Sequence, residues 1–300
     1  MRVMKTGQRK WTSKDGEYSV YRMLIPVVLE LIFTFIISNL NQLILNQFAK
    51  EAVAATTAAG TFLSLMINLY SVFYVGQGIL LAPCWGRKDY AEGSRIWTVS
   101  ICDNLLLSIA LAGVGVFGSP LILKCLQVPG ELQGMAGEYL AVALGLSVFQ
   151  GVALTFGSAF RAIGDMKTVM LGNTLINGSC VFMNWLILRL IPLEEQRIWQ
   201  YVMAGIFAQI FGVLFYLWMA GRDERIELRM FHAQWRERFG ETTGTIARYG
   251  VFGGLEGVIY LVSQTIVMSM IGSLGTEALL VKGYTGNLTN YLTLPASAVS

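Results

Sequence analysis

Charged residues are scarce in this chain. They make up 14% of its 300 residues, whereas an ordinary soluble domain has about a quarter. Histidine occurs once, and there is no HExxH, GxSxG or Walker motif, so we expect no enzyme activity. A net charge of only +3 argues against a nucleic-acid partner. Cys84, Cys102, Cys125 and Cys180 form neither a CxxC pair nor a Cys/His cluster, which indicates neither a zinc site nor a disulfide framework.

The chain contains long hydrophobic segments, and 54% of its residues are hydrophobic. A transmembrane helix needs about 20 mostly apolar residues. Segments of about this length, separated by Gly, Pro or charged residues, run over 23–47, 53–82, 96–118, 136–158, 168–191, 198–220, 249–271 and 278–300. We therefore predict an all-α polytopic membrane protein with eight spans.

Lysine and arginine are distributed unequally between the two sides of these spans. Seventeen lie in the N-terminal stretch and in the loops after the second, fourth and sixth segments, four lie in the opposite loops, and Lys282 lies within the eighth segment. Basic loops are retained in the cytoplasm, so we expect a cytoplasmic N-terminus. The polar stretch 222–246 predicts a cytoplasmic connector, in which RDERIELRMFHAQWRERF has the pattern of an amphipathic surface helix.

A shift of 226 residues aligns the first segment with the seventh. Three charges then meet an identical charge: Arg22 meets Arg248, Glu30 meets Glu256 and Glu51 meets Glu277. Repeated halves are typical of secondary transporters, and equal topology makes this repeat parallel. We expect a cytoplasmic segment (1–22), a six-helix bundle (23–221), the connector (222–246) and the start of a second bundle (247–300). A second unit of equal length would run far beyond Ser300, so we expect a C-terminally incomplete sequence; a short protein that dimerises is the alternative.

Glu30 and Glu256 are the strongest candidates among the carboxylates inside predicted spans. Ionisable groups in a membrane helix are costly and therefore indicate function. Each could bind and release a proton, coordinate sodium or pair with a cationic substrate. The alternative is an interfacial ion pair with Arg22 or Arg248, two helical turns away. Asp103 and Glu138 lie nearer to predicted helix ends, where we expect them to reach water.

Amides form a second polar group, in the first and fifth segments: Asn39, Asn41, Gln42, Asn46, Asn173, Asn177 and Asn184. A polar stripe on a membrane helix must face protein or a cavity. Cavity lining and interhelical hydrogen bonding explain this stripe equally well. Gly253, Gly254 and Gly257 predict close helix packing around Glu256.

Several stretches together resemble the multidrug and toxic compound extrusion (MATE) family. They are Ile25-Pro26 through NQFAKEAVAATTAAG, NLYSVFYVGQGILLAPCWGRKDYAEGSRI, SAFRAIGDMKTVMLGNTLINGSCVFMNWLIL and IGSLGTEALL, and the resemblance covers nearly all of 22–300. It implies a six-plus-six pseudo-two-fold repeat, of which this chain would hold the six-helix N-lobe and about two helices of the C-lobe. It also implies a bacterial inner-membrane antiporter that exchanges cationic drugs or metabolites for H⁺ or Na⁺, with no cofactor, in contact with membrane lipids and monomeric when complete.

The chain departs from the family at positions that would carry the coupling ion. Asn41 and Asn184 stand where DinF-like members have acidic residues, and Tyr260 aligns with a glutamate of NorM-like members. Glu30 instead follows a Pro-x-x-x-Glu pattern that resembles Firmicute-type members, and Glu256 follows the same pattern with Phe252 in place of the proline. We therefore expect Glu30 and Glu256 to couple the ion.

The resemblance further predicts Asn41, Asn177, Asn184 and Tyr260 as residues that line the cavity, with sodium, if used, near Glu30 and Asn184. The alternatives are a flippase for lipid-linked or polysaccharide substrates and a membrane scaffold without transport activity.

Overall fold

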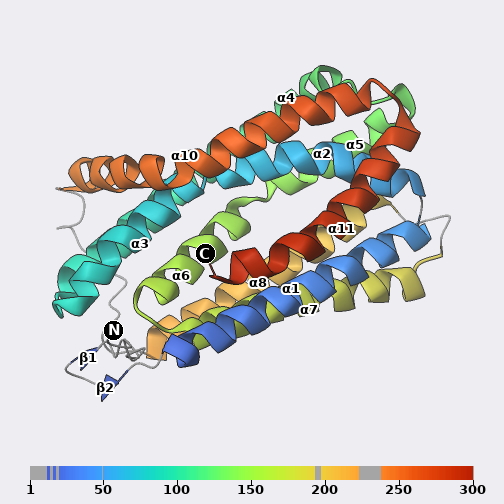
Figure 1. The fold of residues 1–300 in the computed structure, drawn as a ribbon. Helices are drawn as coiled ribbons and strands as arrows, with labels where there is room; N and C mark the ends of the chain where they lie inside the picture. The colour runs from blue at the N-terminus through green and yellow to red at the C-terminus, as the bar shows by residue number, and fades with distance from the viewer. Residues whose placement is uncertain are drawn as a thin grey trace, which may run out of the picture.

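The computed structural model describes the backbone of residues 12–13, 16–17, 20–48, 50–192, 197–222 and 238–299. Apart from an antiparallel pair of two-residue strands, β1 and β2, its regular structure is helical (Figure 1). The elements are β1 (Thr12–Ser13), β2 (Gly16–Glu17), α1 (Val20–Phe48), α2 (Lys50–Asn68), α3 (Ser71–Gly86), α4 (Tyr90–Cys125), α5 (Gly130–Gly145), α6 (Val148–Ala162), α7 (Met166–Leu190), α8 (Ile198–Arg222), α10 (Phe239–Gly272) and α11 (Thr276–Val299). Each predicted segment falls on one helix or on two successive helices.

Capping residues fix the helix ends at one side of the bundle. Asp89 accepts a hydrogen bond from the amide of Glu92 at the start of α4, and Asp165 caps α7 by accepting one from the amide of Thr168, both at 3.2 Å. The preceding residue has a positive φ in each case, and at the second turn it is Gly164, which adopts this conformation without steric cost. The predicted separators therefore are helix ends.

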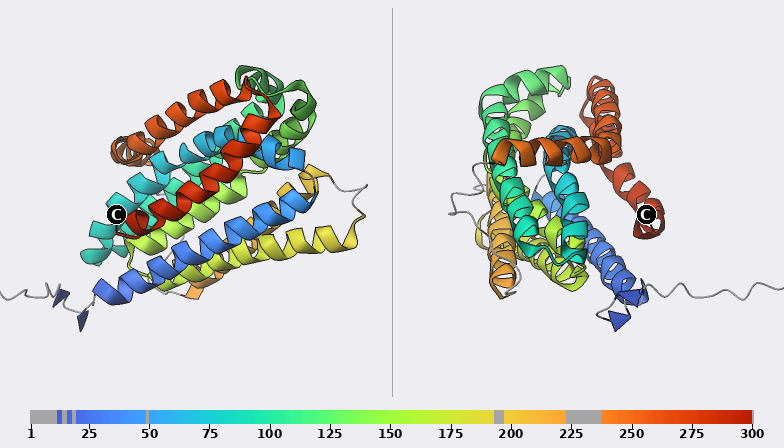
Figure 2. Two further views of the ribbon diagram at one scale, coloured as in Figure 1. Left: turned by 45° about the vertical axis from the view of Figure 1, so that its right-hand side comes forward. Right: turned by 90° about the vertical axis from the view of Figure 1, so that its left-hand side faces the viewer.

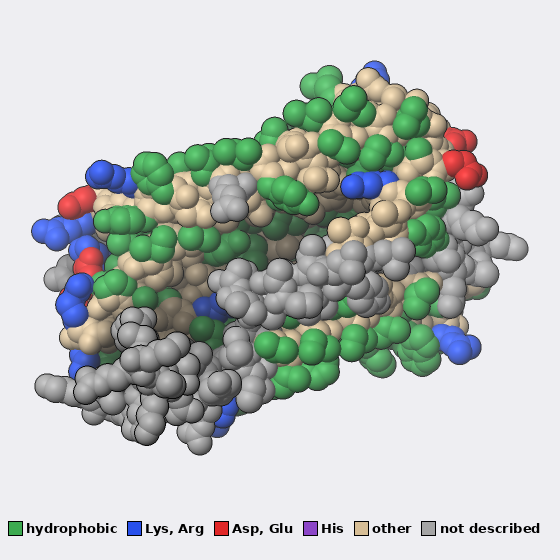
Figure 3. Space-filling view, viewed as in Figure 1, with side chains coloured by type: hydrophobic (Ala, Val, Ile, Leu, Met, Phe, Trp, Pro, Cys, Tyr) green, Lys and Arg blue, Asp and Glu red, His purple; other side chains and the backbone are tan. Residues whose placement is uncertain are grey.

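The surface has the character expected of a protein in a bilayer. Four described spans are long and apolar enough to cross a membrane, or up to six if each bent pair, α5 with α6 and the two halves of α10, forms one span. Large apolar side chains point outwards on several helices, including Phe117 (87% exposed) and Phe252 (77% exposed). Figure 3 shows hydrophobic side chains along the length of the molecule and charged ones mainly at its two ends. The chain is a multi-pass membrane protein.

The first helix of the expected second lobe packs lengthwise on the first lobe. α10 lies along α3 and also contacts α2 and α4, whereas α11 crosses α2 and reaches α1 (Figures 1 and 2). The contact with α3 depends on glycine: a Cβ at Gly250 would overlap the carbonyl oxygen of Val72, and one at Gly76 would overlap that of Ile246. Gly253, Gly254 and Gly257 also meet α3 or Asn68 at the end of α2, so the expected close packing of these glycines is confirmed.

The two larger clusters of buried apolar residues in the described part of the chain each join several helices. One joins α2, the end of α4, α5, α10 and α11 at the end remote from the N-terminus, and its α2 face consists of Ala54, Ala55, Ala58 and Ala59. The other joins α3, α4, α6, α7 and α8 around Trp97, Phe156 and Tyr216. The small α2 face lets neighbouring helices approach closely, and the first cluster thereby ties α10 and α11 to the first lobe.

Three helices start six or more residues earlier than the hydrophobic segments predict. α4 begins at Tyr90 rather than at 96, α5 begins at Gly130 rather than at 136, and α10 begins at Phe239 rather than at 249. Hydrophobicity detects only the part of a helix that lies in lipid, whereas these first turns carry polar residues. The end of the expected connector is consequently helical. Residues 223–237, which include most of the expected amphipathic helix, lie outside the described residues.

Candidate functional site

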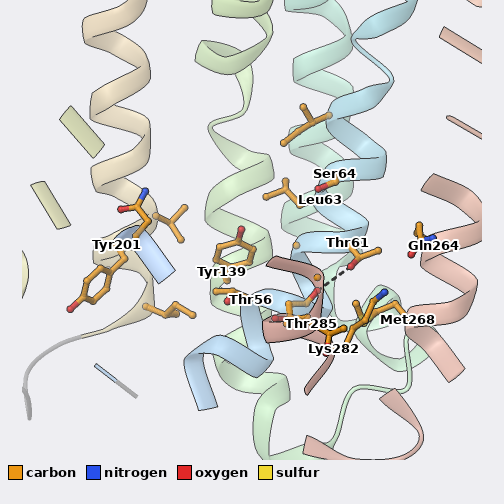
Figure 4. Close-up of a pocket in the computed structure, with 18 of the residues that line it drawn as sticks. Thr56, Thr61, Leu63, Ser64, Tyr139, Tyr201, Gln264, Met268, Lys282 and Thr285 are labelled. Carbon is orange, nitrogen blue, oxygen red and sulfur yellow. Dashed lines mark hydrogen bonds between the residues drawn. The ribbon is translucent and has the colours of Figure 1, made fainter. Parts of the chain in front are cut away.

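A polar cavity of about 830 Å³ opens between helices of both expected lobes (Figure 4). The lining residues come from α1, α2, α5, α7, α8, α10 and α11: Asn41, Thr56, Thr57, Gly60, Thr61, Leu63, Ser64, Ile67, Tyr139, Asn184, Ile198, Tyr201, Val202, Tyr260, Gln264, Met268, Lys282, Gly283, Thr285, Gly286 and Thr289. A smaller space of about 230 Å³ shares Leu63, Tyr139, Tyr201 and Val202 with it and continues between α5 and α8. The volume suits a drug-sized organic molecule.

Residues that the 226-residue shift makes equivalent lie together in the lining of this cavity. α11 begins at Thr276, which is 226 residues after α2 begins at Lys50. Thr57 and Gly283, which are also 226 residues apart, both line the cavity and lie in contact, because a Cβ at Gly283 would be 3.6 Å from the Cβ of Thr57. Equivalent residues of two-fold-related units meet only on the axis. This contact therefore supports a pseudo-two-fold axis between α2 and α11.

Asn41 and Asn184 meet at one wall of the cavity. Asn184 Nδ2 donates to Asn41 Oδ1 at 2.9 Å, and both amides donate to Cys180 Sγ at 3.6 and 3.5 Å. Asn184 Oδ1 is buried and has no hydrogen-bond partner among the described residues. The amide pair thus joins α1 to α7 and leaves one buried carbonyl oxygen without a donor among the described residues.

Glu30 lies in a separate cluster at the other half of α1. Its Oε1 accepts hydrogen bonds from Arg161 Nη2 and Asn173 Nδ2, both at 2.6 Å. The Glu30 side chain is 10% exposed and the Arg161 side chain 48%. Tyr216 donates to Asn173 Oδ1 at 3.3 Å. This network connects α1, α6, α7 and α8 through one buried carboxylate.

Asp103 is a buried carboxylate between the lobes that its sequence position does not reveal. It is 4% exposed and accepts a hydrogen bond from Thr243 of α10 at 3.0 Å, while its Oδ2 is buried and without a hydrogen-bond partner in the described part of the chain. The expectation that it reaches water rests on a helix start at 96. Since α4 begins at Tyr90, Asp103 lies more than three turns inside the helix.

The sequence-predicted site residues fall into three groups. Asn41, Asn184 and Tyr260 line the cavity. Asn177 does not appear in its described lining; it belongs to the Glu30 cluster, where it donates to the backbone oxygen of Asn173 at 2.9 Å. The side chain of Glu256 lies outside the described residues, although the 51° bend of α10 falls at this position.

Sequence reasoning missed two functional candidates, Arg161 and Lys282. Arg161 is the arginine of the Phe-Arg-Ala-x-Gly stretch, but pairing it with Glu30, 131 residues away, requires knowledge of helix packing. Lys282 stands inside a predicted span, and its intramembrane charge was a usable signal. It lines the cavity.

Comparison with known proteins places this arrangement in a family. The MatE family model matches residues 26–186, which is more than half of the chain. "Uncharacterized transporter YisQ" of Bacillus subtilis is 25% identical over 95% of the chain, and "Probable multidrug resistance protein YoeA" of the same organism is 20% identical over 98%.

The structure of the MATE multidrug transporter DinF-BH shares the fold, with a TM-score of 0.81, 15% identity and 98% of this chain covered. The chain spans 63% of YisQ, 65% of YoeA and 66% of DinF-BH. By its sequence and its fold, this chain belongs to the MatE family.

Proposed function

We propose that this chain forms the first lobe and the start of the second lobe of a secondary transporter. It would export organic solutes across the bacterial plasma membrane in exchange for H⁺ or Na⁺. The observation that carries the proposal is the cavity of about 830 Å³, which both lobes line with polar side chains. Family membership supports it, since MatE is a family of transporters rather than of enzymes.

Glu30 is the proposed coupling group of the first lobe. Its carboxylate holds α1 against α6 through Arg161 and against α7 through Asn173. A proton on Glu30 would remove the charge that binds Arg161, and this would loosen α1 at that end. α1 also reaches the cavity through Asn41, so a shift of α1 would alter the solute site. Exchange of a proton for a solute follows from that linkage.

Sodium would need a different site from the Glu30 carboxylate. Asn41 lies eleven residues beyond Glu30 on α1, which is roughly 16 Å at 1.5 Å per residue. One ion therefore cannot contact both Glu30 and the Asn41–Asn184 pair. Asn184 Oδ1 and the amide of Asn41 would provide uncharged oxygen ligands for a sodium ion at the cavity. The Glu30 carboxylate, which lies too far away to share that ion, is then the proposed proton site. Glu256 remains the predicted coupling carboxylate of the second lobe.

The test is dye transport by the full chain in proteoliposomes, with a proton gradient and a sodium gradient applied separately. We expect transport under one gradient, and its loss in Glu30→Gln. Glu138→Gln, which removes an exposed carboxylate from α5, is the matched control and should transport normally. Absence of transport of both cationic and anionic dyes by folded protein under either gradient would contradict the proposal and favour the flippase or scaffold alternatives.

The orientation of the protein is a separate prediction. Cys125 is exposed at the end of α4, at the side of the bundle remote from the N-terminus (Figure 1). If the N-terminus is cytoplasmic, a membrane-impermeant maleimide added to intact cells should label Cys125. A cysteine introduced at Lys88, at the other end of the bundle, should react only after the cells are opened. Labelling in the reverse order would show that the N-terminus faces outwards.

A further inference from the structure

Lys282 is the one charged residue in the described lining of the cavity. The other polar lining residues are neutral: threonines, a serine, tyrosines and amides. No described lining residue is an aspartate or a glutamate. A cavity that selects cations is expected to present negative charge, whereas the described surface of this one is positive.

Lys282 lies in α11, within the predicted span 278–300, and lacks a counter-charge among the described residues. It stands six residues after the start of α11 at Thr276, roughly 9 Å along the helix. The side chain is partly buried, and no described carboxylate forms an ion pair with it. An ammonium in this position is costly unless it meets water or an anion, so the site favours a ligand that brings a negative charge.

Further free donors face the same space. Gln264 of α10, Tyr139 of α5 and Tyr260 line the same cavity as Lys282, and Figure 4 draws Tyr139 and Gln264 on its two sides. None of these three side chains has a hydrogen-bond partner in the described part of the chain. The three lining threonines of α2 instead donate to their own helix, at 3.2 Å for Thr56, 2.7 Å for Thr57 and 3.1 Å for Thr61. The donors left for a ligand therefore include an ammonium, an amide and phenols, which suit carboxylate or sulfonate oxygens.

Apolar side chains complete the lining. Leu63, Ile67, Ile198, Val202 and Met268 offer surface for a hydrophobic body, and the cavity has room for a drug-sized molecule. We propose that the cavity binds amphipathic organic anions, with the Lys282 ammonium as the counter-charge of their acidic group. This proposal rests on the transport function above and names its substrate class. It opposes the expectation of cationic substrates, which comes from the family resemblance and from the carboxylates Glu30 and Glu256.

Two dyes of the same ring system test the charge preference. Fluorescein is anionic and rhodamine 123 cationic near neutral pH, and both are xanthenes of similar size. Binding to the purified full chain is measured by fluorescence anisotropy, without any gradient. We expect fluorescein to bind at least about tenfold more tightly than rhodamine 123. Lys282→Gln should remove that preference, whereas Lys282→Arg should retain it. Lys124→Gln, which removes an exposed cation at the end of α4, is the control and should leave both affinities unchanged.

The outcomes separate this inference from the proposed function. Tighter binding of rhodamine 123 by the wild type would overturn the inference and leave the transport proposal intact. Equal loss of both dyes in Lys282→Gln, at unchanged thermal stability, would also overturn it. A fluorescein preference that appears only in Glu256→Gln would show that Glu256 neutralises the lysine and would likewise overturn it. Failure of both dyes to bind would contradict the organic-solute cavity and hence the proposed function itself.

Discussion

The Glu30–Arg161 ion pair joins a buried carboxylate to a half-exposed guanidinium. Removal of the cation leaves a buried charge without compensation, whereas removal of the carboxylate leaves an arginine that can reach solvent. We predict that Arg161→Gln lowers the free energy of unfolding by about 2 kcal/mol, less than for a fully buried pair, and that Glu30→Gln lowers it by less than half as much. The measurement is thermal or denaturant unfolding of the purified protein in detergent.

The double variant Glu30→Gln/Arg161→Gln provides the control, since it removes both charges at once. It should be more stable than Arg161→Gln alone, because no unpaired carboxylate remains. Equal destabilisation by the two single variants would contradict a buried, charge-compensated Glu30.

For single residues, the sequence predicts candidate site residues more successfully than it predicts their interaction partners. Glu30 stands out because its charge lies inside an apolar segment. The suggested alternative partner, Arg22, is close along the chain, and its side chain lies outside the described residues. The observed partner, Arg161, is set by the packing of α1 on α6 and α7. Long-range pairing of this kind leaves no local signal.

The α3–α10 contact shows how single glycines position a whole helix. A Cβ at Gly250 would overlap the carbonyl oxygen of Val72, whereas one at Gly244, on the same helix, meets nothing within 4 Å. We predict that Gly250→Ala destabilises the protein by about 1–3 kcal/mol because α10 must move away from α3. Gly244→Ala should be neutral or stabilising by up to about 1 kcal/mol, since alanine favours helix.

Thermal unfolding of the two alanine variants distinguishes local helix propensity from interhelical packing. Because both substitutions lie in α10 and add the same methyl group, their propensity effects are alike. Similar melting temperatures for the two variants would mean that α10 does not approach α3 as closely as the structure shows.

Element identity was predictable from hydrophobic length alone, but element boundaries were not. The eight apolar segments each fall on helices, because burial in lipid requires about 20 apolar residues whatever the tertiary packing. The polar first turns of α4 and α10 lie beyond that constraint. The breaks between α2 and α3 and between α5 and α6 fall inside apolar segments and were missed for the same reason.

The expected two-fold repeat of the whole molecule is reflected in the contact between α2 and α11. The sequence predicts this organisation through the 226-residue shift, although identity between the two halves is low. It could not predict that Thr57 and Gly283 meet face to face at the cavity, because this depends on where the axis passes. If the two lobes move relative to each other during transport, α2 and α11 must separate or slide at this point.

A disulfide across this contact tests that motion. The Cβ separation of 3.6 Å between Thr57 and a side chain at Gly283 lies within the range of about 3.5–4.5 Å found in disulfides. With the four native cysteines replaced by alanine, we predict that Thr57→Cys/Gly283→Cys forms the bond on mild oxidation. Transport should then stop, because the lobes are fixed together, and it should return on reduction.

Thr57→Cys alone, oxidised in the same way, controls for the introduced thiol and should keep its transport rate; Gly283→Cys alone is unsuitable, because its Cβ would lie 2.5 Å from Thr57 Oγ1. Failure of the double variant to cross-link would contradict the α2–α11 contact. Full transport by protein shown to be cross-linked would instead mean that α2 and α11 move as one body. Alternating access would then have to come from the movement of other helices. α1 is the first candidate, because the Glu30 carboxylate holds it to α6 and α7.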